Sequence, residues 1–198
     1  MRLQKMLPLI LLVCAAVRPV FAGPFEDASA AFRKGDYETA IRLFRSLAAH
    51  GDAPAQHILG VMYDKGRGVP QDAAAAVMWL RKAAEQGFAE AQNDLGFMYD
   101  QGRGVPQDYA AAAVWYRKAA DQGNASAQND LGFMYGEGRG VPQDYVQAHM
   151  WFDIAAANLA IKQERDTAVR NRDKVAAKMT PAQIAEAQKL AQEWKPKQ

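Results

Sequence analysis

The residues of this 198-residue chain that could carry catalytic or metal chemistry are few and widely spaced. The three histidines do not form the His-x-x-x-His spacing of a zinc site, and the only cysteine is Cys14. No serine lies in Gly-x-Ser-x-Gly or Ser-x-x-Lys, the settings in which serine acts as a nucleophile. The residues considered are His50, His57, His149, Ser29, Ser46 and Ser126. We therefore expect no metal site, no cofactor and no enzymatic activity, with His57 facing solvent or a partner.

A glycine-rich segment, Gly-Arg-Gly-Val-Pro-Gln-Asp, occurs three times, at 66–72, 102–108 and 138–144. It has the first two glycines of a phosphate-binding loop, but the third is missing and no predicted strand precedes it. We interpret it as a turn between helices. Its arginines could line one edge of the molecule and hold an anionic polymer, or they could pair with nearby acidic side chains. They are Arg67, Arg103 and Arg139.

These segments belong to a repeat of 36 residues, which occupies 51–86, 87–122 and 123–158. The first two blocks share 25 of 36 residues, and the second and third share 23. Self-similarity at such a period is typical of stacked units that cannot bury their apolar faces alone. The repeat therefore predicts a curved, all-α solenoid with a continuous core.

The apolar spacing predicts two helices in each block. In the first helix of the second block, Leu95 lies on a buried face with Ala91 and Met98. Gly96 interrupts this helix at a cost of about 1 kcal/mol relative to alanine, so we expect another backbone to pass close to it. Gly102 is expected to end the helix.

The second helix of each block is expected to begin at an aspartate N-cap, Asp108 in the second block. A tryptophan recurs at one position of this helix, at Trp79, Trp115 and Trp151. We expect these to be the largest buried side chains, so that Trp115→Ala costs about 3–5 kcal/mol of stability.

The flanking segments are expected to cap the array, giving about five helix pairs. Residues 23–50 predict a shorter N-terminal pair, and residues 159–198 predict C-terminal capping helices. Ile161, Ala168 and Val175 lie seven residues apart on a charged helix. Thr180-Pro181-Ala182-Gln183 is a capping box that opens a last helix. The buried stripe predicted for that helix is Ile184, Ala187, Ala191 and Trp194.

The order Ala-x-x-x-Leu-Gly-x-Met-Tyr, Gly-x-Gly-Val-Pro-x-Asp and Trp-x-x-x-Ala-Ala is similar to the Sel1-like repeat, a relative of the tetratricopeptide repeat. It matches in full three times, over 51–158, whereas 23–50 looks more like an ordinary tetratricopeptide unit. The resemblance implies an adaptor or scaffold in protein complexes, often in the bacterial envelope or in host contact. Some secreted Sel1-like proteins are linked to penicillin binding, but those are cysteine-rich. This chain has no cysteine after Cys14, so a β-lactamase-like activity is disfavoured.

The first 22 residues have the features of a secretion signal. Arg2 and Lys5 precede an apolar run at 7–17, and Ala22 ends a segment suited to signal peptidase. The run is about half the roughly 20 residues that a membrane span needs. We expect cleavage after Ala22, no span in the mature chain, and a periplasmic or secreted protein. Its removal would change the formal net charge from +2 to −1, which leaves no support for nucleic-acid binding.

One group of residues is a candidate binding site for a protein partner. Asn93 and Phe97 lie about 160–200° around their helix from the buried Leu95, with Asp94 beside them. Asn129, Asp130 and Phe133 repeat this arrangement in the next block. In this repeat class the first helices line the concave face, so we hypothesise a partner-binding ladder of aromatic anchors and polar groups. The alternative is that the two phenylalanines fill the seam between blocks.

The function expected from the sequence is an exported scaffold or adaptor that binds one or more proteins. Binding or hydrolysis of a cell-wall polymer is the alternative, supported only by the arginine edge. A purely structural subunit that spaces other components is a third reading.

Overall fold

The computed structural model describes residues 23–197, and that part of the chain folds into ten helices without a strand. The helices are α1 (Pro24–Arg33), α2 (Tyr37–Ala49), α3 (Ala53–Lys65), α4 (Ala73–Glu85), α5 (Ala89–Gln101), α6 (Tyr109–Asp121), α7 (Ala125–Glu137), α8 (Tyr145–Asn158), α9 (Lys162–Ala176) and α10 (Pro181–Glu193). The expected secretion signal, with Cys14 and the cleavage position after Ala22, lies outside the described residues.

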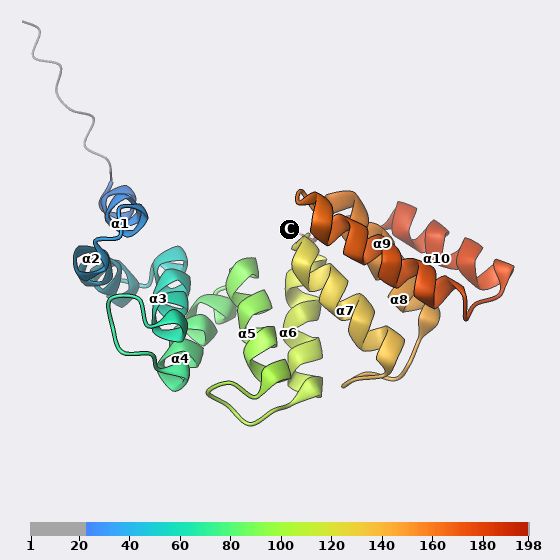
Figure 1. Ribbon diagram of the computed structural model, residues 1–198, viewed down its shortest axis with the longest axis horizontal. Coiled ribbons are helices and arrows are strands. Elements are labelled where there is room, and N and C mark those ends of the chain that lie inside the picture. The colour runs from blue at the N-terminus through green and yellow to red at the C-terminus, as the bar shows by residue number, and fades with distance from the viewer. Residues whose placement is uncertain (1–22, 198) are drawn as a thin grey trace, which may run out of the picture.

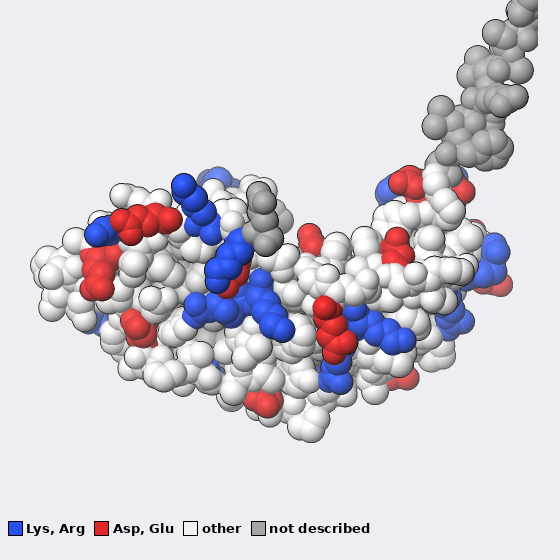
Figure 2. Space-filling model, turned by 180° about the vertical axis from the view of Figure 1, so that it is seen from behind, with Lys and Arg blue, Asp and Glu red and all other residues white. Residues whose placement is uncertain are grey.

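The helices form a solenoid, because each helix from α1 to α8 packs against the next one along the chain. Figure 1 shows the helix pairs following one another along an arc, from α1 and α2 at one end to α9 and α10 at the other. The view from behind has the same curved outline, hollowed along its upper edge (Figure 2). The expected all-α solenoid of about five helix pairs is confirmed.

The predicted caps set the helix ends. The Asp108 side chain accepts a hydrogen bond from the backbone N–H of Ala111 at 2.9 Å, at the start of α6. Gly102 ends α5 with φ 65°, in the left-handed region that glycine adopts without strain. Thr180 and Gln183 form the expected capping box at the start of α10.

The mid-helix glycines make room for a large side chain of the following helix. A Cβ on Gly96 would lie 2.8 Å from the Tyr116 ring, and one on Gly132 would lie 2.9 Å from the Phe152 ring. A backbone carbonyl of the following helix is also close at the equivalent glycines, since that of Ala76 would lie 3.2 Å from a Cβ on Gly60 and that of Ala148 would lie 3.2 Å from one on Gly132. The close backbone expected for this repeat position is therefore present at these two glycines, and at Gly96 the nearest atoms belong to the Tyr116 ring. Glycine at this position therefore lets the following helix approach closely and leaves room for its large side chain, which is Leu80, Tyr116 or Phe152 in the three repeats.

The tryptophan prediction holds for only one block. Trp151 is 2% exposed, but Trp79 and Trp115 are half-buried, and the ammonium of Lys118 lies 4.3 Å from the centre of the Trp115 ring. The next residue, Tyr116, is the one buried in the core, at 3% exposed. Because neighbouring positions on a helix differ by about 100°, the stacking of the repeats selects Tyr116 and turns Trp115 outwards.

A row of glutamines links the helix pairs through the core. Gln92 is buried, and its Nε2 donates to the Ala84 carbonyl at 3.0 Å while its Oε1 accepts from Gln122 at 2.7 Å. Gln56 and Gln128 make the same contacts in their own repeats. Buried amides need such partners. The hydrogen bonds of Gln92 therefore join α4, α5 and α6 in addition to the apolar contacts between these helices.

The C-terminal end departs from the repeat, because α10 packs against α8. Trp194 follows α10 and meets Trp151 edge-to-face, with ring centres 6.1 Å apart. The tail then reaches α6, where the Lys197 N–H donates to the Asp121 carbonyl at 2.7 Å. Figure 1 shows the C-terminus in this position, close to α6 and α7.

The predicted stripes of the last two helices are only partly correct. Ala168 and Val175 are buried, but Ile161 is 58% exposed because it precedes α9 and so leaves the helical phase. In the α10 stripe Ala187 is buried, and Ile184, Ala191 and Trp194 are half-buried.

Candidate partner-binding face

The six predicted binding residues lie on the first-helix face, which we define as the side of α3, α5, α7 and α9 turned away from α4, α6 and α8. Phe97 on α5 and Phe133 on α7 are each 42% exposed. The guanidinium carbons of Arg103 and Arg139 lie 6.0 and 5.6 Å from these two ring centres. Neither phenylalanine is enclosed in a seam between repeats.

The polar members of the ladder differ between the two helices. On α5 the Asp94 carboxylate accepts a hydrogen bond from His57 Nε2 of α3 at 2.8 Å. The His57 ring also packs against Phe88, with ring centres 5.4 Å apart. His57, expected to face solvent or a partner, thus joins two neighbouring repeats.

On α7 the Asp130 carboxylate has no such partner from the preceding repeat. Asn93 occupies the position that His57 occupies one repeat earlier, and its Nδ2 donates to Asp94 at 3.3 Å. Asp130 accepts only from its neighbour Asn129, at 3.4 Å. Burial raises the pKa of Asp130 to about 6, the Asn129 hydrogen bond partly opposes this rise, and the charge of Asp100 adds to it.

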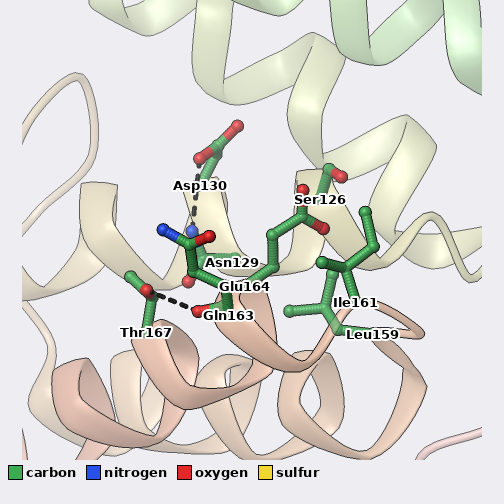
Figure 3. A pocket seen from close by; sticks show the side chains of 8 residues that line it. All are labelled: Ser126, Asn129, Asp130, Leu159, Ile161, Gln163, Glu164 and Thr167. Carbon is green, nitrogen blue, oxygen red and sulfur yellow. Dashed lines mark hydrogen bonds between the residues drawn. The ribbon is translucent and has the colours of Figure 1, made fainter.

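A pocket of about 470 Å³ opens between α7 and α9, on the same face. Figure 3 shows its polar wall on α7 and the facing side chains of α9. The residues that line it are Ser126, Asn129, Asp130, Leu159, Ile161, Gln163, Glu164 and Thr167. Two of the six predicted residues, Asn129 and Asp130, therefore lie in one pocket with the carboxylate of Glu164.

A second pocket, of about 340 Å³, lies between α5 and α7. Phe97 and Phe133 both line it, together with Asp130 and Arg139. Asp130 thus borders both pockets. The structure brings four of the predicted residues, Phe97, Asn129, Asp130 and Phe133, to one continuous stretch of surface, and places Asn93 and Asp94 one step along it beside His57.

The arginine edge is occupied by contacts between repeats. Arg103 pairs with Asp64, and the Arg139 guanidinium lies 3.0 Å from the Asp100 carboxylate. The guanidinium carbon of Arg67 lies 5.7 Å from the ring centre of Phe32. The structure therefore shows the alternative in which arginines pair with nearby acids. On the rear of the molecule, basic and acidic side chains are interspersed with uncharged surface (Figure 2).

The repeat itself is recognised by a family model. The model of the Sel1 repeat matches residues 30–52, 53–88, 89–124 and 125–158. The chain belongs to the Sel1 repeat family. The first match extends into the segment that we expected to form an N-terminal tetratricopeptide-like cap, so the chain contains four Sel1 repeats.

Two solved structures place the chain among Sel1 repeat proteins. A Sel1 repeat protein from Oxalobacter formigenes is 31% identical, with a TM-score of 0.66, over 84% of this chain and 74% of that one. A protective antigen of uropathogenic Escherichia coli that displays an SLR fold is 33% identical, with a TM-score of 0.58. That match covers 84% of this chain but 45% of the antigen, so the chain spans less than half of it. No curated protein sequence matches the chain.

Sel1 repeat proteins generally mediate protein–protein interaction and typically act as non-catalytic scaffolds. Within residues 23–197, no group of histidine and acidic residues has an arrangement that could hold a metal ion. None of the described helices is both long and apolar enough to cross a membrane.

The second wall of the pocket in this Sel1 repeat protein was not predicted from the sequence. Glu164, Gln163 and Thr167 belong to α9, which follows the last repeat and carries none of its motif. Their proximity to Asn129 depends on how α9 packs against α8. The available signal was Glu164 and Thr167 at i, i+3, which places them on one face of a helix.

Proposed function

We propose that this Sel1 repeat chain is an exported scaffold that holds a protein partner on its first-helix face, around α5 and α7. The exposure of Phe97 and Phe133 carries the proposal, because two large rings stand 42% exposed at equivalent positions of successive first helices. Aromatic side chains surrounded by polar groups are typical of the residues that dominate the energy of a protein interface. The neighbouring Asn129 and Asp130 supply directional polar groups.

Binding of an anionic cell-wall polymer has less support. That alternative depended on the arginine edge, and both Arg103 and Arg139 are engaged by aspartates of the preceding repeat. An arginine whose charge is already matched within the protein attracts a polyanion weakly. A protein partner is therefore the favoured occupant.

The test is photocrosslinking from position 97 in intact cells, with a matched control at position 114. Val114 is an exposed apolar residue of α6, 54% exposed, and lies outside the first-helix face. We expect a photoreactive residue at position 97 to form a discrete adduct with another protein that position 114 does not form. Asn93→Ala combined with Asp94→Ala should weaken that adduct while the protein stays folded.

Two outcomes would overturn the proposal. Adducts of equal yield and identity from positions 97 and 114 would indicate contact without a preferred face. Adducts of position 97 with a second copy of this chain alone would replace the scaffold by a self-associating protein.

Export is supported by the basic and apolar segments of residues 1–22. We expect the mature protein to begin at Gly23 and to be recovered from the periplasm or the medium. Mass spectrometry of the purified chain measures the first residue, and cell fractionation measures the location. A chain that keeps residues 1–22 and remains in the cytoplasm would contradict export.

A further inference from the structure

We propose that the pocket between α7 and α9 receives a lysine or arginine side chain of the protein partner, with Asp130 as its counter-ion. The inference rests on the proposed function in one respect, namely that the cation belongs to a protein. The chemistry of the pocket itself is argued from its own residues.

The first observation is that the other buried and half-buried aspartates have a partner: Asp52 and Asp144 accept a backbone N–H at a helix start, and the rest form ion pairs. Asp64 pairs with Arg103, Asp100 with Arg139, Asp94 with His57, Asp153 with Arg172 and Asp121 with Lys197. Among residues 23–197, Asp130 has no basic side chain within ion-pair distance, although burial is strong enough to raise its pKa. A buried carboxylate without a cation costs free energy, so this site is complete only when a ligand supplies the positive charge.

The second observation is an orphaned acceptor in the same pocket. Asn129 Oδ1 is buried and has no hydrogen-bond partner, while its Nδ2 donates to the Asp130 carboxylate. Exchanging the two amide atoms would set an oxygen against that carboxylate, so the amide orientation is fixed by Asp130. Buried acceptors in proteins are almost always satisfied. The unpaired oxygen therefore calls for an N–H donor beside Asp130.

The same asparagine oxygen is unpaired on α5, which makes the comparison informative. Asn93 Oδ1 is buried without a partner, but the carboxylate beside it, Asp94, already accepts from His57. Of the two helices, α7 is the one in which the unpaired amide oxygen lies beside a carboxylate that has no basic partner. The change from His57 to Asn93 at one repeat position leaves Asp130 available.

The rest of the pocket favours a long basic side chain. No lysine, arginine or histidine lines it, and Glu164 of α9 adds a second carboxylate from the opposite wall. Figure 3 shows Glu164 extending from α9 into the space between the two helices. Leu159 and Ile161 provide apolar surface for the methylene groups of such a side chain. An ammonium offers three donors and a guanidinium five, which suits these several acceptors.

The test uses the whole mature protein and small probes that need no partner. N-acetyl-lysine-N-methylamide and the arginine equivalent are titrated at pH 7.5 while NMR follows the side-chain carboxyl carbon of Asp130. The neutral control is N-acetyl-norleucine-N-methylamide, which keeps the apolar stem and lacks the charge. Because a nearby cation favours the ionised carboxylate, we expect saturating basic probe to lower the pKa of Asp130 and the neutral probe to leave it unchanged.

Variants then locate the effect. Asp130→Asn should weaken the basic probes about tenfold, the loss typical of one charge-assisted hydrogen bond. Asp94→Asn, the same change one repeat earlier, should leave their affinity within about twofold, since that carboxylate already has a partner. Glu164→Gln should weaken them less than Asp130→Asn does.

The proposal is overturned if the neutral probe binds as tightly as the basic ones, or if Asp130→Asn leaves their affinity unchanged. A pKa of Asp130 that does not fall with saturating basic probe would also overturn it, and this measurement needs no variant. Failure of crosslinking from position 97 combined with a positive result here would reject the proposed partner face and leave the cation site standing. The reverse pair of results would reject the cation site alone.

Discussion

The middle of the array and its C-terminal end make the same contacts between repeats with different residues. In the middle, Arg81 of α4 donates to the hydroxyl of Tyr99 on α5 at 2.7 Å, and Arg117 of α6 donates in the same way to the hydroxyl of Tyr135 on α7. At the end, Asp153 replaces the arginine and accepts from Arg172 of α9 at 2.9 Å. The polarity of the contact is reversed where the repeated sequence stops, because α9 brings an arginine to an acidic residue of α8.

The first-helix face shows the same difference with a functional consequence. Between α3 and α5 the polar position is closed, because His57 satisfies Asp94. Between α7 and α9 the equivalent position is open, because Asp130 has only Asn129 as a hydrogen-bond partner and a pocket separates it from α9. Residues common to all repeats hold the solenoid together, and the change from His57 to Asn93 leaves open the position that we propose as a ligand site.

The largest expected effect compares one tryptophan position in the two regions. Trp151→Ala should lower the free energy of unfolding by about 3–5 kcal/mol, because the ring is 2% exposed and packs against Trp194. Trp115→Ala should cost about 1–2 kcal/mol, since the half-buried ring loses less contact. Urea unfolding of the two variants measures both values.

Equal losses for the two tryptophan variants would contradict the difference in packing. Trp194→Ala is the control for the end region, because it removes the partner of Trp151 and leaves Trp115 untouched. We expect Trp194→Ala and Trp151→Ala to be less than additive, as residues in contact are.

The second effect compares two glycines of α7. Gly132→Ala should cost about 2 kcal/mol, because the new Cβ would lie 2.9 Å from the buried Phe152 ring. Gly136→Ala should gain a few tenths of a kcal/mol, up to about 1, through helix propensity. Its Cβ would lie 3.6 Å from Val175, an ordinary contact, and earlier repeats carry aspartate at this position. A gain in stability for both variants in urea unfolding would show that helix propensity outweighs packing at both sites.

The sequence was sufficient for the features that depend on local chemistry. The period fixes the number of units, and the caps at Asp108, Gly102 and Thr180 follow from side-chain and backbone preferences within a few residues. The sequence was not sufficient to choose between Trp115 and Tyr116 as the buried ring. Both are large aromatics on adjacent positions, and the choice depends on the rotation of α6 against α5, which long-range packing sets.

The position of the candidate face was predictable from the sequence. The pocket beside Asp130, and the lack of a basic partner for this residue, were not. Helical phase alone directs Asn129 and Phe133 away from the buried stripe of α7, whereas Asp130 lies only about 60° around the helix from Ala127. The missing partner of Asp130 follows from contacts across a repeat boundary, and the pocket follows from the placement of α9. The pocket depends on residues outside the repeat, such as Glu164 and Ile161, whose positions cannot be inferred by analogy with the other repeats.

The smallest expected effect compares two aspartates at one repeat position. The pKa of Asp130 is raised to about 6 in the folded protein, whereas an aspartate in an unfolded chain has a pKa of about 3.9. The folded state therefore holds the Asp130 proton more tightly than the unfolded state does. As a result, the free energy of unfolding falls as the pH rises from about 4 to 6 and Asp130 ionises. A shift of this size corresponds to at most about 3 kcal/mol. Partial exposure and the Asn129 hydrogen bond reduce the expected gain from Asp130→Asn to about 1 kcal/mol at pH 7.5.

This gain should disappear below about pH 4, where Asp130 is protonated in both states. Asp94→Asn is the control, because the Asp94 carboxylate is partnered by His57 and its neutralisation should not stabilise the protein. Urea unfolding of both variants at pH 7.5 and pH 4 measures the difference. A destabilised Asp130→Asn at pH 7.5 would mean that the carboxylate is satisfied within the fold, and the open region would then resemble the closed one. A gain confined to Asp130 would show that the chain retains a charge that weakens it, as expected of a residue kept for binding.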